Sequence, residues 1–107
     1  MCNLLVSQGP ASYAAETRPI RLHGHATSIR LEAAFWDILE QIADRESMPV
    51  ARFVSVLHDE IMNQRGEVPN FASFLRVTCV HWLRHQDLHA AQLAARRAAQ
   101  EKELVLS

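Results

Sequence analysis

The sequence predicts a mainly α-helical protein with a short β ribbon close to its start. Three patterns carry this prediction: apolar and polar residues alternate over 18–31, apolar residues recur at helical spacing over 33–63, and helix-favouring residues dominate from residue 70 onward. The chain has 107 residues, 49% of them hydrophobic, and a formal net charge of -1. A chain of this size and composition can fold as one domain with an apolar core.

The predicted ribbon consists of two strands, Arg18–Leu22 and Thr27–Leu31. Ile20 and Leu22 alternate with Arg21, and Thr27, Ile29 and Leu31 alternate with Ser28 and Arg30. We therefore expect one face of the ribbon to be buried and the other to carry basic and hydroxyl groups. The connecting residues 23–26 include Gly24, which favours a tight turn. Pro19 places the first strand at a sheet edge, because proline cannot donate a ladder hydrogen bond.

Two amphipathic helices are predicted to follow the ribbon. The first covers Ala33–Arg45, and the second runs from about Pro49 to Asn63. We expect Ser47 to cap the second helix and Pro49 to occupy its first turn, where a missing N–H costs little. The apolar stripes consist of Phe35, Ile38, Leu39 and Ile42 in the first helix and Val50, Phe53, Val54, Leu57 and Ile61 in the second.

A third, long helix is predicted from Asn70, a residue suited to capping, to Glu103. Its first half carries aromatic residues on one face, which we expect to lie in the core or in a chain interface, and its second half is rich in Ala, Leu, Gln, Arg and Glu. We therefore divide the chain into an N-terminal arm (1–17), a domain (18–83) and a C-terminal helical extension (84–107).

Composition argues against several classes of protein. Cys2 and Cys79 lie far apart without C-x-x-C spacing, so we expect reduced thiols, not a disulfide framework or zinc knuckle. The sequence has no secretory signal and no apolar run long enough to span a membrane, so we expect a cytoplasmic protein. It contains no nucleophile, base and orienting set and no phosphate-binding glycine loop, so it predicts neither an enzyme nor a cofactor.

A local basic patch coincides with the predicted ribbon. Between Glu16 and Glu32 the chain carries Arg18, Arg21 and Arg30 but no acidic residue. A basic ribbon followed by two helices is a known way of entering a DNA groove. Because the overall pI is about 6.6, the pattern indicates a focused site rather than general coating of nucleic acid.

The same segment predicts a homodimer. Residues 18–63 are near the size below which one chain buries too little surface, and the strand with Ile29 and Leu31 would have an open edge. Pairing this strand with its copy in a second chain removes the edge and covers the helical stripes. Two-fold symmetry would match a palindromic DNA site, and association of dimers into larger assemblies on DNA is left open.

Several segments are informative when taken together: Thr27–Glu32, Phe35–Trp36, Leu39, Ile42–Ala43, Ser47–Pro49 and Asn70–Val77. With them, roughly residues 1–83 resemble a bacterial ribbon-helix-helix domain family related to the Arc and MetJ type of repressor. The resemblance implies an intertwined homodimer whose two-stranded ribbon enters the major groove, while the start of the second helix holds a phosphate. The strand Arg18–Leu22 and the long C-terminal helix are additions to that minimal fold.

Base contacts are expected from the strand Thr27–Leu31. The guanidinium of Arg30 can fork onto guanine N7 and O6, and the Ser28 hydroxyl can contact a base edge or a phosphate. The resemblance places both residues at groove-facing positions and Ala26 at the third. Ala26 departs from the family pattern, because its side chain cannot hydrogen-bond a base.

Phosphate contacts are expected from cations flanking the ribbon, such as Arg21, and from His25 beside the turn. The resemblance assigns the phosphate-holding helix start to Pro49–Ala51. Pro49 departs from the family pattern, because it lacks the hydroxyl and the backbone N–H of the polar residue often found there. The full set of DNA-contact candidates is Arg30, Ser28, Arg21, Ala26, Arg18, His25, Pro49, Val50, Ala51 and Arg52.

The sequence thus predicts a DNA-binding transcriptional regulator, a repressor by analogy with the family, whose partners are double-stranded DNA and a second copy of the chain. One alternative is an antitoxin-like adaptor that captures a protein partner through the helix Asn70–Glu103. Another is metal-gated DNA binding through His81, His85 and His89, which recur every four residues. No thiolate or carboxylate matches this ladder, so we interpret it as a hydrophilic face and assign no metal site.

Overall fold

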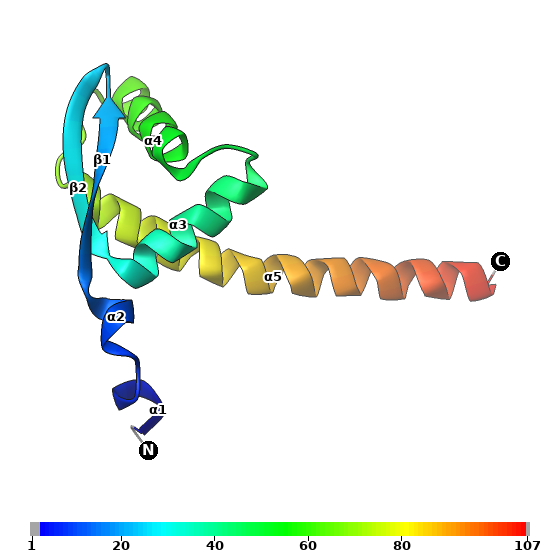
Figure 1. Cartoon of the computed structure of the whole chain (residues 1–107). Coiled ribbons are helices and arrows are strands. Elements are labelled where there is room, and N and C mark those ends of the chain that lie inside the picture. The colour runs from blue at the N-terminus through cyan, green and yellow to red at the C-terminus, as the bar shows by residue number, and fades with distance from the viewer. Residues whose placement is uncertain (1–2, 107) are drawn as a thin grey trace.

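The computed structural model describes residues 3–106, with side-chain surroundings for 3–86 and 94–102. A β ribbon and the following helices form a body, from which a long C-terminal helix and a short N-terminal arm extend in different directions (Figure 1). The predicted mainly helical fold with a short ribbon is confirmed. The elements are α1 (Asn3–Val6), α2 (Pro10–Tyr13), β1 (Ala15–Leu22), β2 (His25–Glu32), α3 (Ala33–Arg45), α4 (Val50–Arg65) and α5 (Phe71–Leu106).

β1 and β2 form an antiparallel hairpin whose register runs from the pair Ala15 and Glu32 to the turn. His23 and Gly24 form the turn with φ values of 50° and 77°. Two positive φ values are typical of the tight turns that match strand twist. Both strands are longer than predicted, because backbone pairing continues past the residues whose side chains alternate. Pro19 lies on β1, which pairs with β2 on one edge and has no strand on its other edge among the described residues, so its missing N–H disrupts no further pairing there.

The N-terminal segment, for which the sequence predicted no fold, contains α1, α2 and the first residues of β1. The N–H of Ala33 donates a 2.9 Å hydrogen bond to the carbonyl of Ala14, which ties the end of this segment to the start of α3. From residue 3 onward the arm adds no buried residue, and its apolar side chains Leu4, Leu5, Val6 and Tyr13 are exposed.

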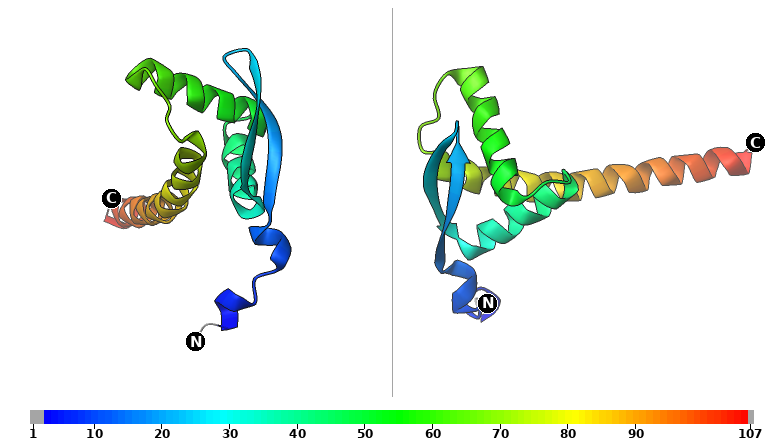
Figure 2. Two further views of the ribbon diagram at one scale, coloured as in Figure 1. Left: turned by 90° about the vertical axis from the view of Figure 1, so that its left-hand side faces the viewer. Right: turned by 45° about the horizontal axis from the view of Figure 1, so that its top comes forward.

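The core lies among the ribbon, α3, α4 and the first turns of α5. In Figure 2, α3 lies between the ribbon and the start of α5, and α4 crosses one end of the body. The buried face of α3 is centred on Trp36, Leu39 and Ala43, whereas Phe35 and Ile38 of the predicted stripe are half-buried. The buried core residues are Ile20, Ile29, Leu31, Trp36, Leu39, Ile42, Ala43, Phe53, Val54, Leu75 and Cys79.

The connection between α3 and α4 differs from its prediction. Ser47 does not cap α4; it adopts a φ of 57° just beyond α3 and its N–H donates to the carbonyl of Asp44 at 3.1 Å. Pro49 occupies the N-cap position of α4. At the other end, Gly66 takes the left-handed conformation with a φ of 77° and donates to the carbonyl of Met62, a common helix termination.

Much of the core is covered within one chain. β1 pairs with one edge of β2, and α5 contributes Leu75 and Cys79, both fully buried. The sequence argument for a partner assumed an open strand edge and uncovered helical stripes. In the structure, β1 pairs with one edge of β2, and the first turns of α5 cover part of the helical stripes. Core burial alone therefore does not require a second chain. Burial also raises the pKa of the Cys79 thiol to about 11, so this free cysteine stays protonated.

Candidate nucleic-acid interface

The hairpin register separates the two faces of the ribbon. Ile20 of β1 and Ile29 and Leu31 of β2 are buried against the helices. The opposite face is exposed, and its cross-strand neighbours are Thr17 with Arg30, Pro19 with Ser28, and Arg21 with Ala26. The structure thus brings the groove-facing candidates Ala26, Ser28 and Arg30 onto one exposed surface together with Arg21.

Arg30 is the exposed cation in the middle of this face. Among the described side chains it has neither an ion pair nor a hydrogen bond, so its guanidinium can reach a ligand without breaking an internal contact. Arg21 lies near the turn, where its Nη1 donates to the carbonyl of Gly24 at 3.3 Å. His25 is exposed at the same end of the ribbon.

Arg18 lies on the other face. Its Nη1 is 2.6 Å from Glu40 on α3, its Nη2 is 3.2 Å from Glu16, and its guanidinium carbon lies 4.8 Å from the ring centroid of Trp36. The hydrogen bond with Glu40 is the main reason that the pKa of Arg18 is raised above its ordinary value. Because residue 18 has the same strand parity as Ile20, the sequence already contained the signal that it faces inward. We therefore leave Arg18 out of the interface.

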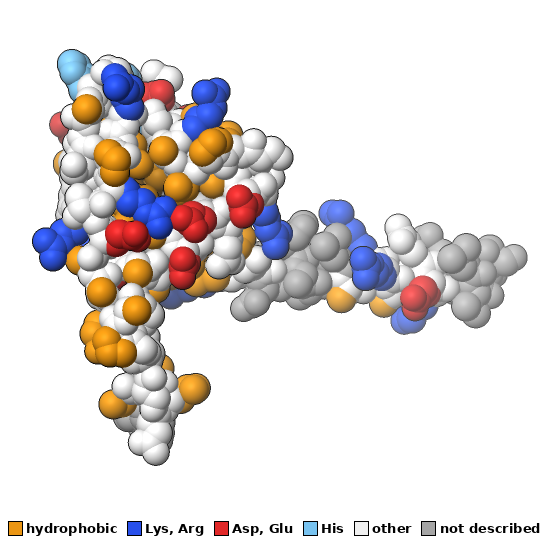
Figure 3. Space-filling model, in the orientation of Figure 1, with side chains coloured by type: hydrophobic (Ala, Val, Ile, Leu, Met, Phe, Trp, Pro, Cys, Tyr) orange, Lys and Arg blue, Asp and Glu red, His pale blue; other side chains and the backbone are white. Residues whose placement is uncertain are grey.

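The space-filling view shows the consequence for surface charge. On the face shown in Figure 3, basic and acidic side chains lie side by side over the middle of the body, while basic side chains, a histidine and a smaller area of acidic atoms lie at its upper end. The basic patch predicted from the sequence is therefore divided. One part is neutralised by acids of the same chain, and the exposed part is carried by the outer face of the ribbon.

The start of α4 is the predicted phosphate site. Pro49 is its N-cap, with extended φ and ψ of -63° and 150°, and it makes no side-chain cap hydrogen bond. Ala51 and Arg52 are exposed, and Val50 is half-buried. The N–H groups of the first helical turn have no acceptor within an α-helix, and the helix dipole adds partial positive charge there. Pro49 precedes this turn, so its missing N–H does not remove the donors of residues 50–52.

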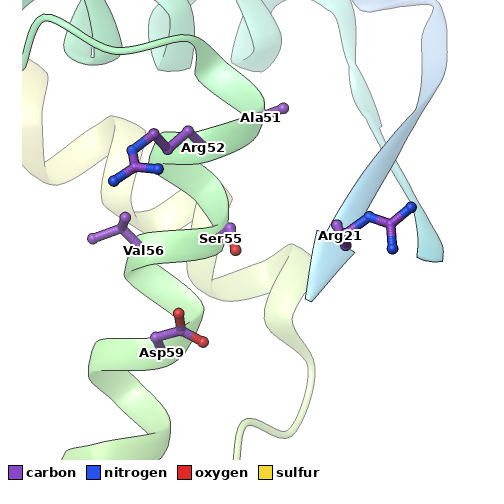
Figure 4. Close-up of a pocket in the computed structure, with 6 residues that line it drawn as sticks. All are labelled: Arg21, Ala51, Arg52, Ser55, Val56 and Asp59. Atoms are coloured by element: carbon purple, nitrogen blue, oxygen red, sulfur yellow. The ribbon is translucent and has the colours of Figure 1, made fainter. Parts of the chain in front are cut away.

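An open pocket of about 330 Å³ lies between this helix and β1. Figure 4 shows Ala51 and Ser55 on the side of α4 that faces β1, while Arg21 and Arg52 point away from each other. The pocket therefore does not gather its two guanidinium groups around one ligand, and we treat the two arginines as separate contacts. Its full lining is Arg21, Ala51, Arg52, Ser55, Val56 and Asp59.

The predicted histidine ladder is described only in part. The rings of His81 and His85 lie 3.9 Å apart, with His85 Nδ1 3.0 Å from the carbonyl of His81, and the side chain of His89 is outside the described residues. Among the described side chains, the group with metal-ligand spacing is instead His23, His58 and Asp59. Sequence reasoning treated His23 as a turn residue and missed the other two, because only tertiary packing brings the turn to α4.

A two-stranded antiparallel ribbon followed by helices is an architecture of proteins that place β strands in a DNA groove. Residues 15–83 match the family described as ribbon-helix-helix domain. Because this match covers more than half of the chain, the protein belongs to the ribbon-helix-helix domain family. The resemblance inferred from the sequence is thereby confirmed.

The solved structure of an uncharacterized protein from Bordetella pertussis Tohama I is similar to this chain. The two are 48% identical with a TM-score of 0.75, and the similarity covers 85% of this chain and 70% of the other. No curated protein shows significant similarity to the sequence. Among the described residues, no helix combines the length and apolar character needed to cross a membrane.

Proposed function

We propose that this protein is a sequence-specific DNA-binding transcription regulator, acting as a repressor, that reads the major groove with the outer face of β2. The observation that carries the proposal is the position of Arg30. It is exposed and lacks an internal partner among the described residues, on the strand that precedes the two helices of a ribbon-helix-helix domain. A regulator of this kind would act on DNA in the cytoplasm.

The candidate DNA-contact side chains of the ribbon have separate proposed roles. Arg30 donates to guanine N7 and O6, which discriminates against other bases by about 1–3 kcal/mol per good contact. Ser28 contacts a base edge or a phosphate, and Ala26 offers only apolar contact, for example with a thymine methyl group. Arg21, on the outer face near the turn, contacts a phosphate and positions the ribbon. His25 has the strand parity of the buried Ile29, but it is exposed at the turn end of the hairpin and contacts a phosphate from there.

The start of α4 is proposed to hold a phosphate of the same duplex. The backbone N–H groups of Val50, Ala51 and Arg52 provide donors at the positive end of the helix dipole. Arg52 adds a full charge next to them. Since Pro49 contributes neither a hydroxyl nor an N–H, the side chain of Arg52 replaces part of what a polar cap residue would provide.

We further propose that the regulator is a homodimer. Within the described residues, β2 has β1 on one edge and no strand on the other. Its copy in a second chain can pair there, with β2 strands at the centre and β1 strands outside. With strands about 4.8 Å apart, the outer strands would be about 14 Å from each other. A major groove about 12 Å wide accepts the central pair, which leaves β1 and its Arg21 near the phosphates.

The surface of α5 supports a contact with another chain, which bears on both the homodimer and the adaptor hypothesis. Outside the N-terminal arm, the exposed large apolar side chains of the described residues are Phe74, Val77, Val80 and Leu83, all on α5. Exposed apolar residues that follow one another along a helix mark an interaction surface. A second copy of this chain is the occupant that we propose, and a different protein partner is the alternative.

Selection of binding sites from a random DNA pool tests the function directly. We expect an enriched, near-palindromic sequence containing guanine, bound by the full-length protein with an affinity that falls steeply as salt increases. A pool that shows no enrichment and no salt-sensitive retention would contradict DNA recognition. If a protein co-purifies with the full-length chain and is lost in Val77→Asp, which changes the exposed apolar surface of α5, the adaptor role is favoured instead.

A further inference from the structure

We propose that His23, His58 and Asp59 form a binding site for a divalent transition metal ion that joins the hairpin turn to α4. His23 lies in the turn between β1 and β2, and His58 and Asp59 are neighbours on α4. One ligand atom from each of the three side chains lies within 4.8 Å of the other two. These residues are different from the histidines of the ladder on α5.

The spacing is close to what a metal ion requires. Zinc binds imidazole nitrogen and carboxylate oxygen at about 2.0–2.2 Å, so two ligands of a tetrahedral site are about 3.4 Å apart. His23 Nδ1 lies 3.5 Å from Asp59 Oδ1. The rings of His23 and His58 are 5.3 Å apart and nearly perpendicular. Small rotations of exposed or half-buried side chains would bring all three ligand atoms to bonding distance.

Two atoms of this cluster, His58 Nδ1 and Asp59 Oδ1, are buried and have no hydrogen-bond partner among the described residues. His23 Nδ1 lies at an ion-pair distance from that oxygen, which is longer than a good hydrogen bond. A buried polar atom without a partner is unfavourable, so such atoms call for an explanation. A metal ion between them would satisfy both, because a neutral imidazole nitrogen and a carboxylate oxygen are electron-pair donors.

The turn places His23 beside α4. Its φ of 50° lies in the left-handed region, which histidine adopts more often than most residues other than glycine, asparagine and aspartate. The ring of His58 packs edge-to-face against the ring of Phe71, with ring centroids 5.0 Å apart and an angle of 89° between the ring planes.

The chemistry of the ligands narrows the choice of metal. Two imidazoles and one carboxylate suit Zn²⁺, Ni²⁺ or another late first-row ion, whereas Mg²⁺ and Ca²⁺ prefer sites made of oxygen ligands. A bound ion would fix the turn end of the ribbon, with Arg21 and His25, against α4. Its effect on DNA affinity rests on the proposed function, but the metal site itself does not.

The test uses the full-length protein without a histidine tag, titrated with Zn²⁺ and with Mg²⁺ by calorimetry in the absence of DNA. We expect one Zn²⁺ per chain and no Mg²⁺ binding. His23→Asn, which keeps a residue suited to the turn, and Asp59→Asn should each weaken Zn²⁺ binding at least tenfold. Zn²⁺ should also raise the melting temperature of the wild type more than that of either variant, because it binds the folded state.

The double variant His81→Ala/His85→Ala is the matched control, since it removes two other exposed histidines and should leave Zn²⁺ binding unchanged. Circular dichroism verifies that every variant is folded. The proposal is overturned if His23→Asn and Asp59→Asn bind Zn²⁺ as the wild type does, or if the control variant loses binding. Because DNA is absent, either result leaves the proposed DNA-binding function to its own test.

Discussion

The guanidinium of Arg18 on β1 lies 2.6 Å from the carboxylate of Glu40 on α3, with the ring of Trp36 beneath it. A basic side chain in the ribbon thus fastens the ribbon to the first helix of the motif. Arg18 therefore has a structural role, whereas Arg21 and Arg30 of the same ribbon remain exposed to solvent.

The Arg18 and Glu40 pair is expected to be a modest stabilising contact, because both side chains are partly exposed. Removing either partner by Arg18→Ala or Glu40→Gln should lower the free energy of unfolding by about 1 kcal/mol, and the double variant should reveal a coupling of about 0.5–1 kcal/mol. Urea denaturation measures both quantities. Purely additive effects would mean that the pair is not coupled in solution.

Trp36 is fully buried, and its Nε1–H donates a 2.8 Å hydrogen bond to the carbonyl of Glu16. Trp36→Phe removes this donor and part of the side-chain volume, so we expect a loss of about 1–3 kcal/mol in the free energy of unfolding. Thermal or urea unfolding provides the measurement. The control is Trp82→Phe, because Trp82 is only half-buried and should be less sensitive. Equal losses for the two variants would contradict this interpretation.

Glu32, at the end of β2, accepts a 2.8 Å hydrogen bond from Arg76 Nε on α5, and this contact lowers the pKa of Glu32 below its ordinary value. A depressed folded-state pKa stabilises the protein above the unfolded-state pKa, and this contribution is lost as pH falls through the folded-state value. NMR titration should show the pKa of Glu32 rising in Arg76→Gln. An unchanged pKa would assign the shift to another group.

Arg30→Ala tests the proposed groove contact. We expect binding to the selected DNA site to weaken by about 1–3 kcal/mol, with discrimination lost at one guanine position. Arg65→Ala is the matched control, because Arg65 is an exposed arginine at the last turn of α4. Fluorescence anisotropy at two salt concentrations separates the lost base contact from a general loss of charge. Equal weakening in both variants would contradict a specific role for Arg30.

Val77→Asp tests the surface of α5 as a contact between copies of the chain. Val77 is 63% exposed in the single chain, so the substitution should leave the fold intact while burying a charge in any dimer formed there. We expect light scattering over a dilution series to show that the dimer of Val77→Asp dissociates at a higher protein concentration than the wild-type dimer, because the α5 surface would add to the pairing of the β2 strands. The control is Val6→Asp on the N-terminal arm, where the valine is 79% exposed. An unchanged dissociation constant of the dimer in Val77→Asp would exclude this surface.

Local patterns in the sequence determined the ribbon, the order of the helices and the outward parity of Ser28 and Arg30, because side-chain direction in a strand follows a period of two. The stripe of α3 was predicted in part. Of the expected residues, Leu39 and Ile42 are buried, whereas Phe35 and Ile38 are half-buried and the neighbouring Trp36 is fully buried. Periodicity identifies an apolar face only approximately when adjacent residues are both apolar, and packing decides which of them is central.

Contacts between distant segments were decided only by the tertiary structure. Three such contacts join residues far apart along the chain. They are the ion pair of Arg18 with Glu40, the packing of β1 and α5 against the core, and the cluster of His23 with His58 and Asp59. A period within one segment reports which side of that segment is apolar, whereas the neighbour on that side depends on how the whole chain packs. The sequence alone therefore determined the family and the candidate DNA-reading strand, and three-dimensional packing decided which charges remain available on its surface.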